Sequence, residues 1–226
     1  MKYTVMIPAA GSGKRMGAGQ NKLFLKIGEH PILYHTAGIF QEDPNCEEVI
    51  MAVKPEEQDT IQKILGQRKH AKPVTFVEGG GERQNSVAAC IDAYKGNGIV
   101  LVHDAARPFL NSSVISELVR TASEKGAAIA AVKAKDTIKY AEDGTVRETL
   151  EREKLWLVQT PQAFRYELLK EASESAVRDG FLGTDESMLV ERLGHSVQVV
   201  ESSYDNVKMT TREDLAIGEI LLARRK

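Results

Sequence analysis

Cysteine is scarce in this sequence. Its two cysteines, Cys46 and Cys90, lie far apart, and neither belongs to a CxxC pair. We therefore expect no disulfide framework and no structural zinc site, and we interpret both residues as small buried hydrophobic side chains. A reducing compartment is the default for such a chain, so we expect a cytoplasmic protein.

Long apolar runs and a strong excess of either charge are also missing. The longest purely apolar run, 127–132, is far too short to cross a bilayer, and Met1 leads directly into a predicted strand without a signal peptide. The net charge of −2 gives no general attraction to nucleic acid or to acidic membranes, so any anion site must be local. The 226 residues, 42% of them hydrophobic, suit one large α/β domain with a full core.

The most informative stretch reads PAAGSGKRMG at 8–17, directly behind the apolar run 3–7. The run predicts a strand, and the small residues after it predict a loop whose backbone can approach a ligand closely. Gly11 and Gly13 permit unusual backbone angles and can turn their amides toward phosphate oxygens. Arg15 and Lys22 add positive charge, so the loop is suited to holding a polyphosphate.

Two better-known phosphate loops do not fit this stretch. The dinucleotide fingerprint needs glycine where Met16 stands and an acid at the end of the second strand, where Lys54 stands. The P-loop needs four residues between its glycines, whereas one residue separates Gly11 from Gly13 here. The remaining alternative is a plain strand-to-helix turn with solvated lysines. The number of cations close to the turn argues against this alternative.

Strand and helix patterns alternate along the chain without internal repeats. Strands are predicted over 3–7, 48–53, 73–77, 99–102, 127–132, 155–158 and 197–201, and helices over 31–41, 56–65, 83–94, 113–125, 166–178, 185–193 and 211–225. Thr211 and Asp214 can form a capping box at the start of the last helix. Repeated β-α-β units predict a Rossmann-like, doubly wound and mainly parallel sheet with helices on both faces.

The pattern changes over 133–153. Two strand-like segments, 137–140 and 146–149, flank a Glu-Asp-Gly turn, and the region has many charges and few core candidates. This predicts a projecting hairpin. Because an exposed two-stranded arm is marginal in water and has unpaired edges, we expect it to pack against the same arm of a second copy in a two-fold dimer. We treat 1–226 as a single domain with 133–153 as its protruding dimerisation arm.

Unusual loops follow several of the predicted strands, at the sheet edge where α/β proteins bind ligands. Besides the first loop, they bring Gly79, Gly80, Arg83 and Ser86 after the third strand, Asp104 and Arg107 after the fourth, and Asp205 and Lys208 late in the chain. Two separated carboxylates among many cations suggest Mg²⁺ bridging a nucleoside triphosphate. The alternative for Asp104 is a turn residue in an ion pair with Arg107.

Five motifs, taken in order, give the chain a family resemblance. They are PAAGSGKRMG with Lys22, GGGERQNSV, VHDAARP, TPQAF and DNVKMT. Together they resemble the 2-C-methyl-D-erythritol 4-phosphate cytidylyltransferases of the non-mevalonate isoprenoid pathway, from about Tyr3 to Leu222. The resemblance implies a nucleotidyltransferase that moves CMP from CTP to this polyol phosphate, giving 4-diphosphocytidyl-2-C-methyl-D-erythritol and pyrophosphate. The family often has Pro-Lys-Gln where this chain has Asn21-Lys22-Leu23, which leaves the lysine in place.

The resemblance also implies roles for individual residues. Arg15 and Lys22, with Lys208, would be catalytic, the first two by stabilising the crowded α-phosphorus transition state. Nucleotide-binding residues would be Ala9, Ala10, Gly11, Gly13, Gly79, Gly80, Arg83, Ser86 and Ala105. Asp104 and Asp205 would hold Mg²⁺. The acceptor phosphate would be positioned by Thr137, Arg152, Thr160, Thr184, Asp205 and Lys208, with Thr137 and Arg152 reaching across a clasped dimer.

The implied chemistry needs little acid or base catalysis. Nucleotidyl transfer depends on in-line positioning and charge neutralisation, and a phosphate nucleophile is already ionised at pH 7. We therefore interpret His103 as a structural residue at a strand end. Two alternatives stay open: a cytidylyltransferase for another polyol phosphate such as D-ribitol 5-phosphate, and a non-catalytic nucleotide-sensing module, which would have no need of the full set of cations and carboxylates.

Overall fold

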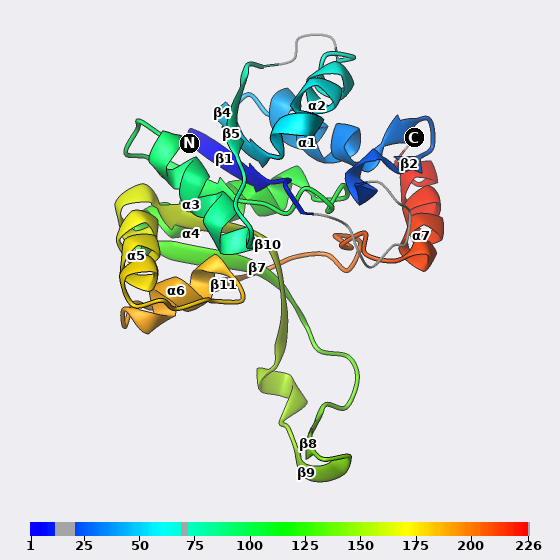
Figure 1. Ribbon diagram of the computed structural model, residues 1–226. Coiled ribbons are helices and arrows are strands. Elements are labelled where there is room, and N and C mark those ends of the chain that lie inside the picture. The colour runs from blue at the N-terminus through cyan, green and yellow to red at the C-terminus, as the bar shows by residue number, and fades with distance from the viewer. Residues whose placement is uncertain (12–20, 69–71, 226) are drawn as a thin grey trace.

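A seven-stranded sheet forms the centre of the structure, a computed structural model that describes residues 1–11, 21–68 and 72–225 (Figure 1). The strand order is β11-β7-β10-β6-β1-β4-β5. The strands are β1 (Tyr3–Pro8), β4 (Cys46–Val53), β5 (Val74–Glu78), β6 (Ile99–Val102), β7 (Ala127–Lys133), β10 (Trp156–Arg165) and β11 (Gln198–Glu201). Strand β10 runs antiparallel to both of its neighbours, whereas the other described pairings in this sheet are parallel. The predicted mainly parallel sheet is confirmed.

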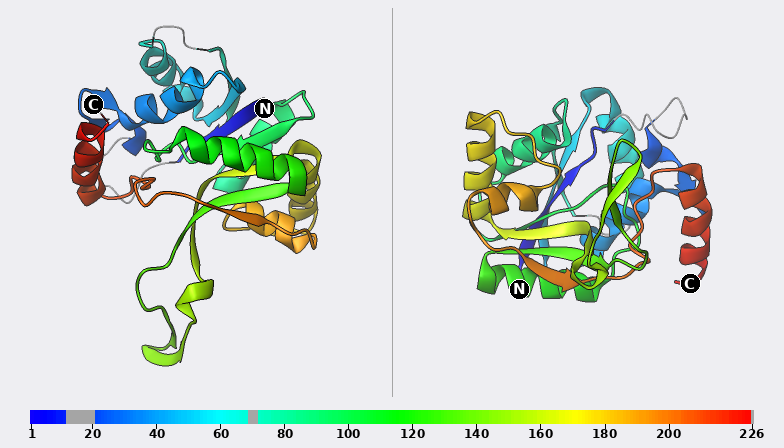
Figure 2. Two further views of the ribbon diagram at one scale, coloured as in Figure 1. Left: turned by 180° about the vertical axis from the view of Figure 1, so that it is seen from behind. Right: turned by 90° about the horizontal axis from the view of Figure 1, so that it is seen from below.

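Helices cover both faces of the sheet, as Figures 1 and 2 show. The buried side chains form two clusters. One cluster includes side chains from α1 (Ile32–Glu42), α2 (Gln58–Leu65), α4 (Ser112–Lys125) and α7 (Arg212–Ala223). The other includes side chains from α3 (Arg83–Ala93), α5 (Tyr166–Arg178) and α6 (Glu186–Arg192). Successive residues of β1 alternate between the clusters, since Val5 and Ile7 enter the first and Met6 the second. A strand buried on both faces explains the continuous apolar runs in the sequence.

Several elements differ from their predicted bounds. Strand β10 was predicted over 155–158 but continues to Arg165, with a register shift between Val158 and Gln162. The helix predicted from 56 begins at Gln58, behind the 3₁₀ turn η3 (Pro55–Glu57). A small hairpin of β2 (Lys26–Ile27) and β3 (His30–Pro31), after the 3₁₀ turn η2 (Lys22–Phe24), was not predicted. The capping box of α7 between Thr211 and Asp214 is confirmed.

The predicted hairpin is present and projects away from the sheet (Figures 1 and 2). Strands β8 (Lys139–Glu142) and β9 (Thr145–Thr149) pair antiparallel, and η4 (Arg152–Lys154) follows them. Asp143 and Gly144 link the strands with φ of 49° and 75°. A two-residue loop with both central φ angles positive matches the twist of an antiparallel pair, which is why an Asp-Gly sequence forms it. None of the described helices is long and apolar enough to cross a membrane.

Candidate active site

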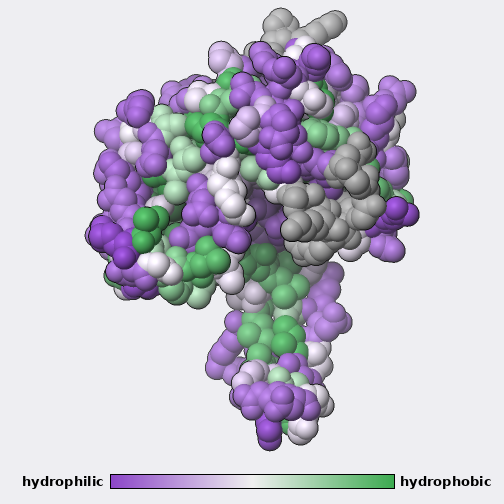
Figure 3. Space-filling view, in the orientation of Figure 1, coloured by the Kyte–Doolittle hydropathy of each residue, from purple (hydrophilic) through white to green (hydrophobic). Residues whose placement is uncertain are grey.

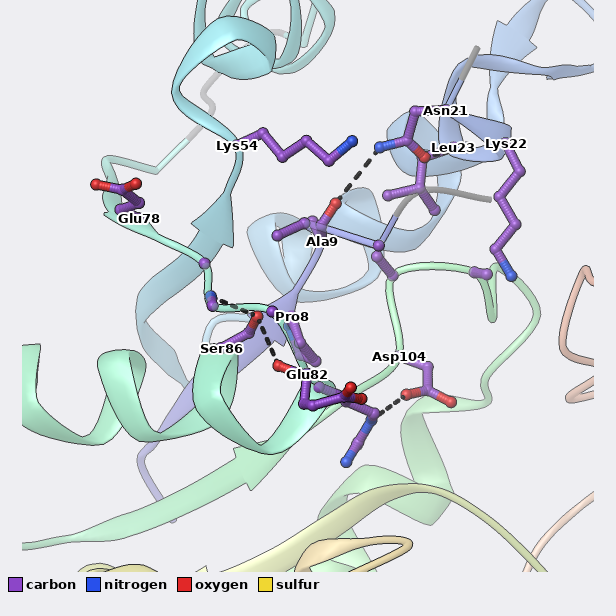
Figure 4. A pocket seen from close by; sticks show the side chains of 18 of the residues that line it. Pro8, Ala9, Asn21, Lys22, Leu23, Lys54, Glu78, Glu82, Ser86 and Asp104 are labelled. Atoms are coloured by element: carbon purple, nitrogen blue, oxygen red, sulfur yellow. Dashed lines mark hydrogen bonds and ion pairs between the residues drawn. The ribbon is translucent and has the colours of Figure 1, made fainter. Parts of the chain in front are cut away.

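A cavity of about 650 Å³ opens where β1, β4, β5 and β6 end at one edge of the sheet. This is the edge at which the sequence predicted a ligand site. Its walls come from segments far apart in the chain, so that Lys22, Lys54, Ser86 and Asp104 border the same space (Figure 4). Of the predicted site residues, those that line it are Ala9, Ala10, Gly11, Lys22, Gly79, Gly80, Arg83, Ser86, Asp104, Ala105 and Lys208.

The first wall is the segment that follows β1. Gly13 and Arg15 lie outside the described residues, so their predicted roles stay predictions. Lys22 lies in η2 and donates from Nζ to the Met209 carbonyl over 3.0 Å. Asn21 caps η2 by accepting from the Leu23 amide at 3.1 Å. The residue that replaces the family's common proline thus sets the local turn that carries Lys22.

The second wall is the turn after β5, where two glycines are required by close packing. A Cβ on Gly79 would stand 2.2 Å from the Ala10 Cβ, and one on Gly80 would stand 2.3 Å from the Asn85 Cβ. The Gly80 amide donates to Ser86 Oγ over 3.2 Å, which fastens the turn to α3. The backbone of this turn therefore lies directly against the β1 loop, with no room for a side chain between them.

Asp104, just beyond the end of β6, is the centre of a buried charge network. Its side chain is 9% exposed, and its Oδ1 accepts from Arg83 Nε at 3.1 Å. Its Oδ2 lies 2.7 Å from Lys208 Nζ and 3.6 Å from Arg107 Nε. Burial alone would raise the pKa of this carboxyl, but Arg83, Lys208 and Arg107 together hold the pKa well below its usual range. Asp104 therefore forms the ion pair with Arg107 expected of a turn residue, but this is one of its three ion pairs.

Glu186, the first residue of α6, completes this network, and the sequence analysis did not identify it. Arg83 Nη1 donates to both Glu186 carboxylate oxygens, at 2.7 and 2.8 Å. Burial raises the pKa of Glu186, although Arg83 opposes that change. An acid in the first turn of a helix is usually explained by the helix dipole. No local pattern signals the contact, since α6 and α3 are brought together by the fold.

Two buried residues support Asp104 from behind. The Asp104 amide donates to Thr160 Oγ1 at 3.0 Å, and Oγ1 lies 3.2 Å from His103 Nδ1. Burial lowers the pKa of His103 to about 4, so the imidazole is neutral at pH 7. A carbonyl only accepts, so Nε2 carries the single proton of the neutral ring and donates to the Arg107 carbonyl at 3.1 Å. Nδ1 is then an acceptor, and the Thr160 hydroxyl donates to it. These contacts fit the structural role predicted for His103. They also engage the Thr160 hydroxyl, which was expected to contact the acceptor phosphate.

Of the other predicted acceptor residues, Lys208 lines the cavity, whereas Thr137, Arg152, Thr184 and Asp205 are not among the lining residues. Thr137, Thr184 and Asp205 are exposed. Arg152 lies at the base of the arm, where it donates to the Lys135 carbonyl at 3.1 Å and forms an ion pair of 3.7 Å with Glu153. The described chain does not by itself bring these exposed residues to Asp104.

The carboxylates of the cavity bear on the implied metal. Among the described residues, no group of three or more His, Cys, Asp or Glu side chains could hold a metal ion. Mg²⁺ in nucleotide sites is commonly held by one or two carboxylates together with substrate phosphates. Asp104, buried beside a cavity lined by cations, fits that mode of binding. Asp205 is exposed and stands apart from the lining.

Comparisons with known proteins agree with this architecture. Residues 3–224 match the family model described as IspD, 2-C-methyl-D-erythritol 4-phosphate cytidylyltransferase. A protein of that name from Lysinibacillus sphaericus is 56% identical over 225 residues, which cover 100% of this chain and 97% of the relative, and one from Bacillus pumilus is 48% identical over 98% of this chain and 97% of the relative.

Solved structures carry the same fold. The 4-diphosphocytidyl-2C-methyl-D-erythritol synthase of Anaerococcus prevotii superposes with a TM-score of 0.87 at 29% identity, covering 99% of this chain and 96% of the other. The 2-C-methyl-D-erythritol 4-phosphate cytidylyltransferase of Thermus thermophilus gives a TM-score of 0.79 at 34% identity, covering 99% of this chain and 100% of the other. The predicted resemblance is confirmed over nearly the whole sequence, and the chain belongs to the 2-C-methyl-D-erythritol 4-phosphate cytidylyltransferase family.

Proposed function

We propose that this protein transfers CMP from CTP to 2-C-methyl-D-erythritol 4-phosphate, giving 4-diphosphocytidyl-2-C-methyl-D-erythritol and pyrophosphate for isoprenoid precursor synthesis. The observation that carries the proposal is one cavity, lined by Lys22 and a glycine turn, in which Arg83 and Lys208 pair with the carboxylate of Asp104. Such a site has the charges that nucleotidyl transfer needs, and membership of the family supplies the substrates.

The reaction forms one bond and breaks one. An oxygen of the acceptor phosphate attacks the α-phosphorus of CTP, and the bond from that phosphorus to the bridging oxygen of the β-phosphate breaks, so pyrophosphate leaves with the electron pair. Because the attacking oxygen is already ionised, no general base is needed. Lys22 and Lys208 come from opposite ends of the chain, and with Arg15 they would neutralise the charge that builds up in the transition state.

The nucleotide would lie between the two glycine segments. The backbone at Ala9, Ala10, Gly11 and Gly13 would hold the triphosphate. The turn at 79–80, with Arg83, Ser86 and Ala105, would enclose cytosine and ribose. Because that turn packs against the β1 loop without space for a Cβ, the base site would be narrow and would favour a pyrimidine over a purine.

Asp104 and Asp205 would hold a divalent cation in the working enzyme. Mg²⁺, when bound, neutralises triphosphate oxygens and orients them. Asp104 is suited to this because Arg83, Lys208 and Arg107 hold its pKa well below its usual range, so it is ionised at pH 7. Asp205 would join it once substrate is bound.

We place a second copy of the chain against the arm. Apolar side chains are exposed along it and on the part of β10 next to it: Tyr140 and Val146 on the arm, and Leu157 and Val158 on β10, are each 43% to 56% exposed. Figure 3 shows this apolar surface running down the arm. Burial in a two-fold dimer would remove it from water. Thr137 and Arg152 of each arm would then complete the acceptor site of the other subunit together with Thr184. The buried free cysteines agree with a cytoplasmic location.

Pyrophosphate release tests the reaction. We expect turnover with CTP and 2-C-methyl-D-erythritol 4-phosphate, little with ATP or GTP, and loss of activity after EDTA that is restored by added Mg²⁺. D-ribitol 5-phosphate serves as the matched acceptor. A faster reaction with ribitol phosphate would reassign the substrate, equal rates with CTP and ATP would refute the narrow base site, and CTP binding without turnover on any acceptor would indicate a sensor.

A mixing experiment tests the shared site. Arg152→Ala and Lys22→Ala subunits are each expected to be inactive, but a heterodimer of the two regains one intact site. Activity well above either parent is the expected result, up to about a quarter of wild type when half the molecules are heterodimers, each with one site. If the mixture stays inactive while subunit exchange is confirmed by tagged pull-down, or if the protein sediments as a monomer at micromolar concentration, the shared site is wrong.

A further inference from the structure

Glu186 is a buried charge that the proposed reaction does not use. It is 1% exposed, and its carboxylate meets Arg83 through both oxygens. Removing such a charge from water is costly, and a hydrophobic pair of the same size often serves stability equally well. Its presence therefore calls for a reason other than stability.

The backbone that carries Glu186 is fixed on both sides to the central sheet. Asp185 caps α6 by accepting from the Met188 amide, and its Oδ2 accepts from Gln162 Nε2 at 2.9 Å. The Ser187 amide donates back to Gln162 Oε1 at 3.0 Å. Gln162 lies on β10, is fully buried and pairs in register with Val102 of β6. The carboxylate thus comes from a rigid support at the strand ends that border the cavity.

Glu186 divides the Arg83 guanidinium between two acids. Glu186 holds Nη1, and the contact of Arg83 with Asp104 is the single bond from Nε to Oδ1. Arg83 Nη2 is buried and has no hydrogen-bond partner among the described residues. A guanidinium can pair with one carboxylate through two parallel bonds, and that is its stronger mode. For Asp104 that mode would need Nη2 beside Nε, and Nη2 makes no such bond while Glu186 fixes the guanidinium through Nη1, so Oδ2 is left to Lys208.

We propose that Glu186 is a positioning residue for the nucleotide cavity: it holds Arg83 away from a two-bond pairing with Asp104, and so keeps the Asp104 carboxylate and Lys208 available to the nucleotide. The inference rests on the proposed function, since the ligand it serves is CTP with its cation. Without the Glu186 carboxylate, Arg83 turns to Asp104, Lys208 is displaced, and Asp104 becomes a poorer site for any other cation.

The variant Glu186→Gln tests this, because it keeps the side-chain volume and removes the charge. We expect the Kd for CTP with Mg²⁺, measured by calorimetry without acceptor, to rise roughly tenfold, the scale of one charge-assisted contact. In steady state the KM for CTP should rise by a similar factor while kcat changes less than twofold, because Glu186 does not touch the reacting atoms. Asp185→Asn is the matched control, since it disturbs the start of α6 but leaves the Glu186 charge in place. Its CTP affinity should stay within threefold of wild type.

A double-mutant cycle separates positioning from general damage. In an Arg83→Met background, Glu186→Gln should change the CTP Kd less than twofold, since the guanidinium it controls is gone. In the same Arg83→Met background, Glu186→Gln should raise the midpoint of urea unfolding, because the substitution removes a buried carboxylate that has lost its partner. A tenfold effect that persists in the Arg83→Met background overturns the inference. So does a folded Glu186→Gln enzyme with wild-type affinity, or an equal loss in Asp185→Asn. Wild-type protein that binds no CTP would instead refute the proposed function, and this inference with it.

Discussion

Replacing Thr160 by valine offers a sharp test of the hydrogen bonds behind the cavity. Valine has the shape of threonine but no hydroxyl, so the substitution leaves two buried groups unpaired, the Asp104 amide and His103 Nδ1. The imidazole cannot recover by changing tautomer, because Nε2 must keep its proton for the Arg107 carbonyl. Each unsatisfied buried group costs about 1–3 kcal/mol, so the two together cost about 2–6 kcal/mol, and we take about 3 kcal/mol as the working value.

The loss should be visible in simple unfolding experiments. For a chain of this length, about 3 kcal/mol corresponds to a fall in Tm of roughly 6–12 °C. Thr160→Ser is the matched control, because it keeps the hydroxyl and loses one methyl group, at a cost of about 1 kcal/mol. Urea denaturation of both variants at one protein concentration gives the comparison. Equal stability of the valine and serine variants, within about 0.5 kcal/mol, would refute the assigned hydrogen bonds.

Three further predictions address the catalytic cations, the glycine turn and pH. Arg15→Ala or Lys22→Ala should lower kcat by on the order of a hundredfold with little change in CTP affinity, and near-normal kcat would make that residue a solvated loop cation. Gly79→Ala should weaken CTP binding in a titration, whereas Gly81→Ala, where a Cβ would meet nothing within 4 Å, should not. Because the unfolded state binds a proton at His103 near pH 6.5 and the folded state near 4, stability should fall by about 3 kcal/mol between those values as pH is lowered, and His103→Gln should flatten that slope.

Local patterns predicted the sheet and its helices well, because buried parallel strands are continuous apolar runs and helices repeat every three to four residues. The end of β10 was missed for a physical reason. Pro161 ordinarily ends a strand, but here it falls within the interval 158–162 where the register with β7 shifts, and an interrupted ladder tolerates a residue without an amide proton. The antiparallel direction of β10 could not be predicted from its own residues either, because it depends on which strands pair with it in the sheet.

The candidate site divides in the same way. Sequence placed Asp104, Lys208 and Arg83 together, because residues after parallel strands meet at one edge. It could not supply Glu186, whose partner lies far away in the chain and whose position in α6 has an ordinary local explanation. The family resemblance implied Thr160 at the acceptor, which stays a prediction, but sequence could not supply the contacts of its hydroxyl with the Asp104 amide and the His103 imidazole.

The antiparallel setting of β10 has a consequence for engineering. Lys133 of β7 and Trp156 of β10 are register partners, and the Ala134 amide donates to the Leu155 carbonyl at 3.0 Å, so the chain leaves and re-enters the sheet side by side. Parallel neighbours would need a crossover there, but an antiparallel pair can be closed by a turn of two residues. The arm can therefore be removed, lengthened or exchanged for another segment without changing the order or direction of any strand in the central sheet.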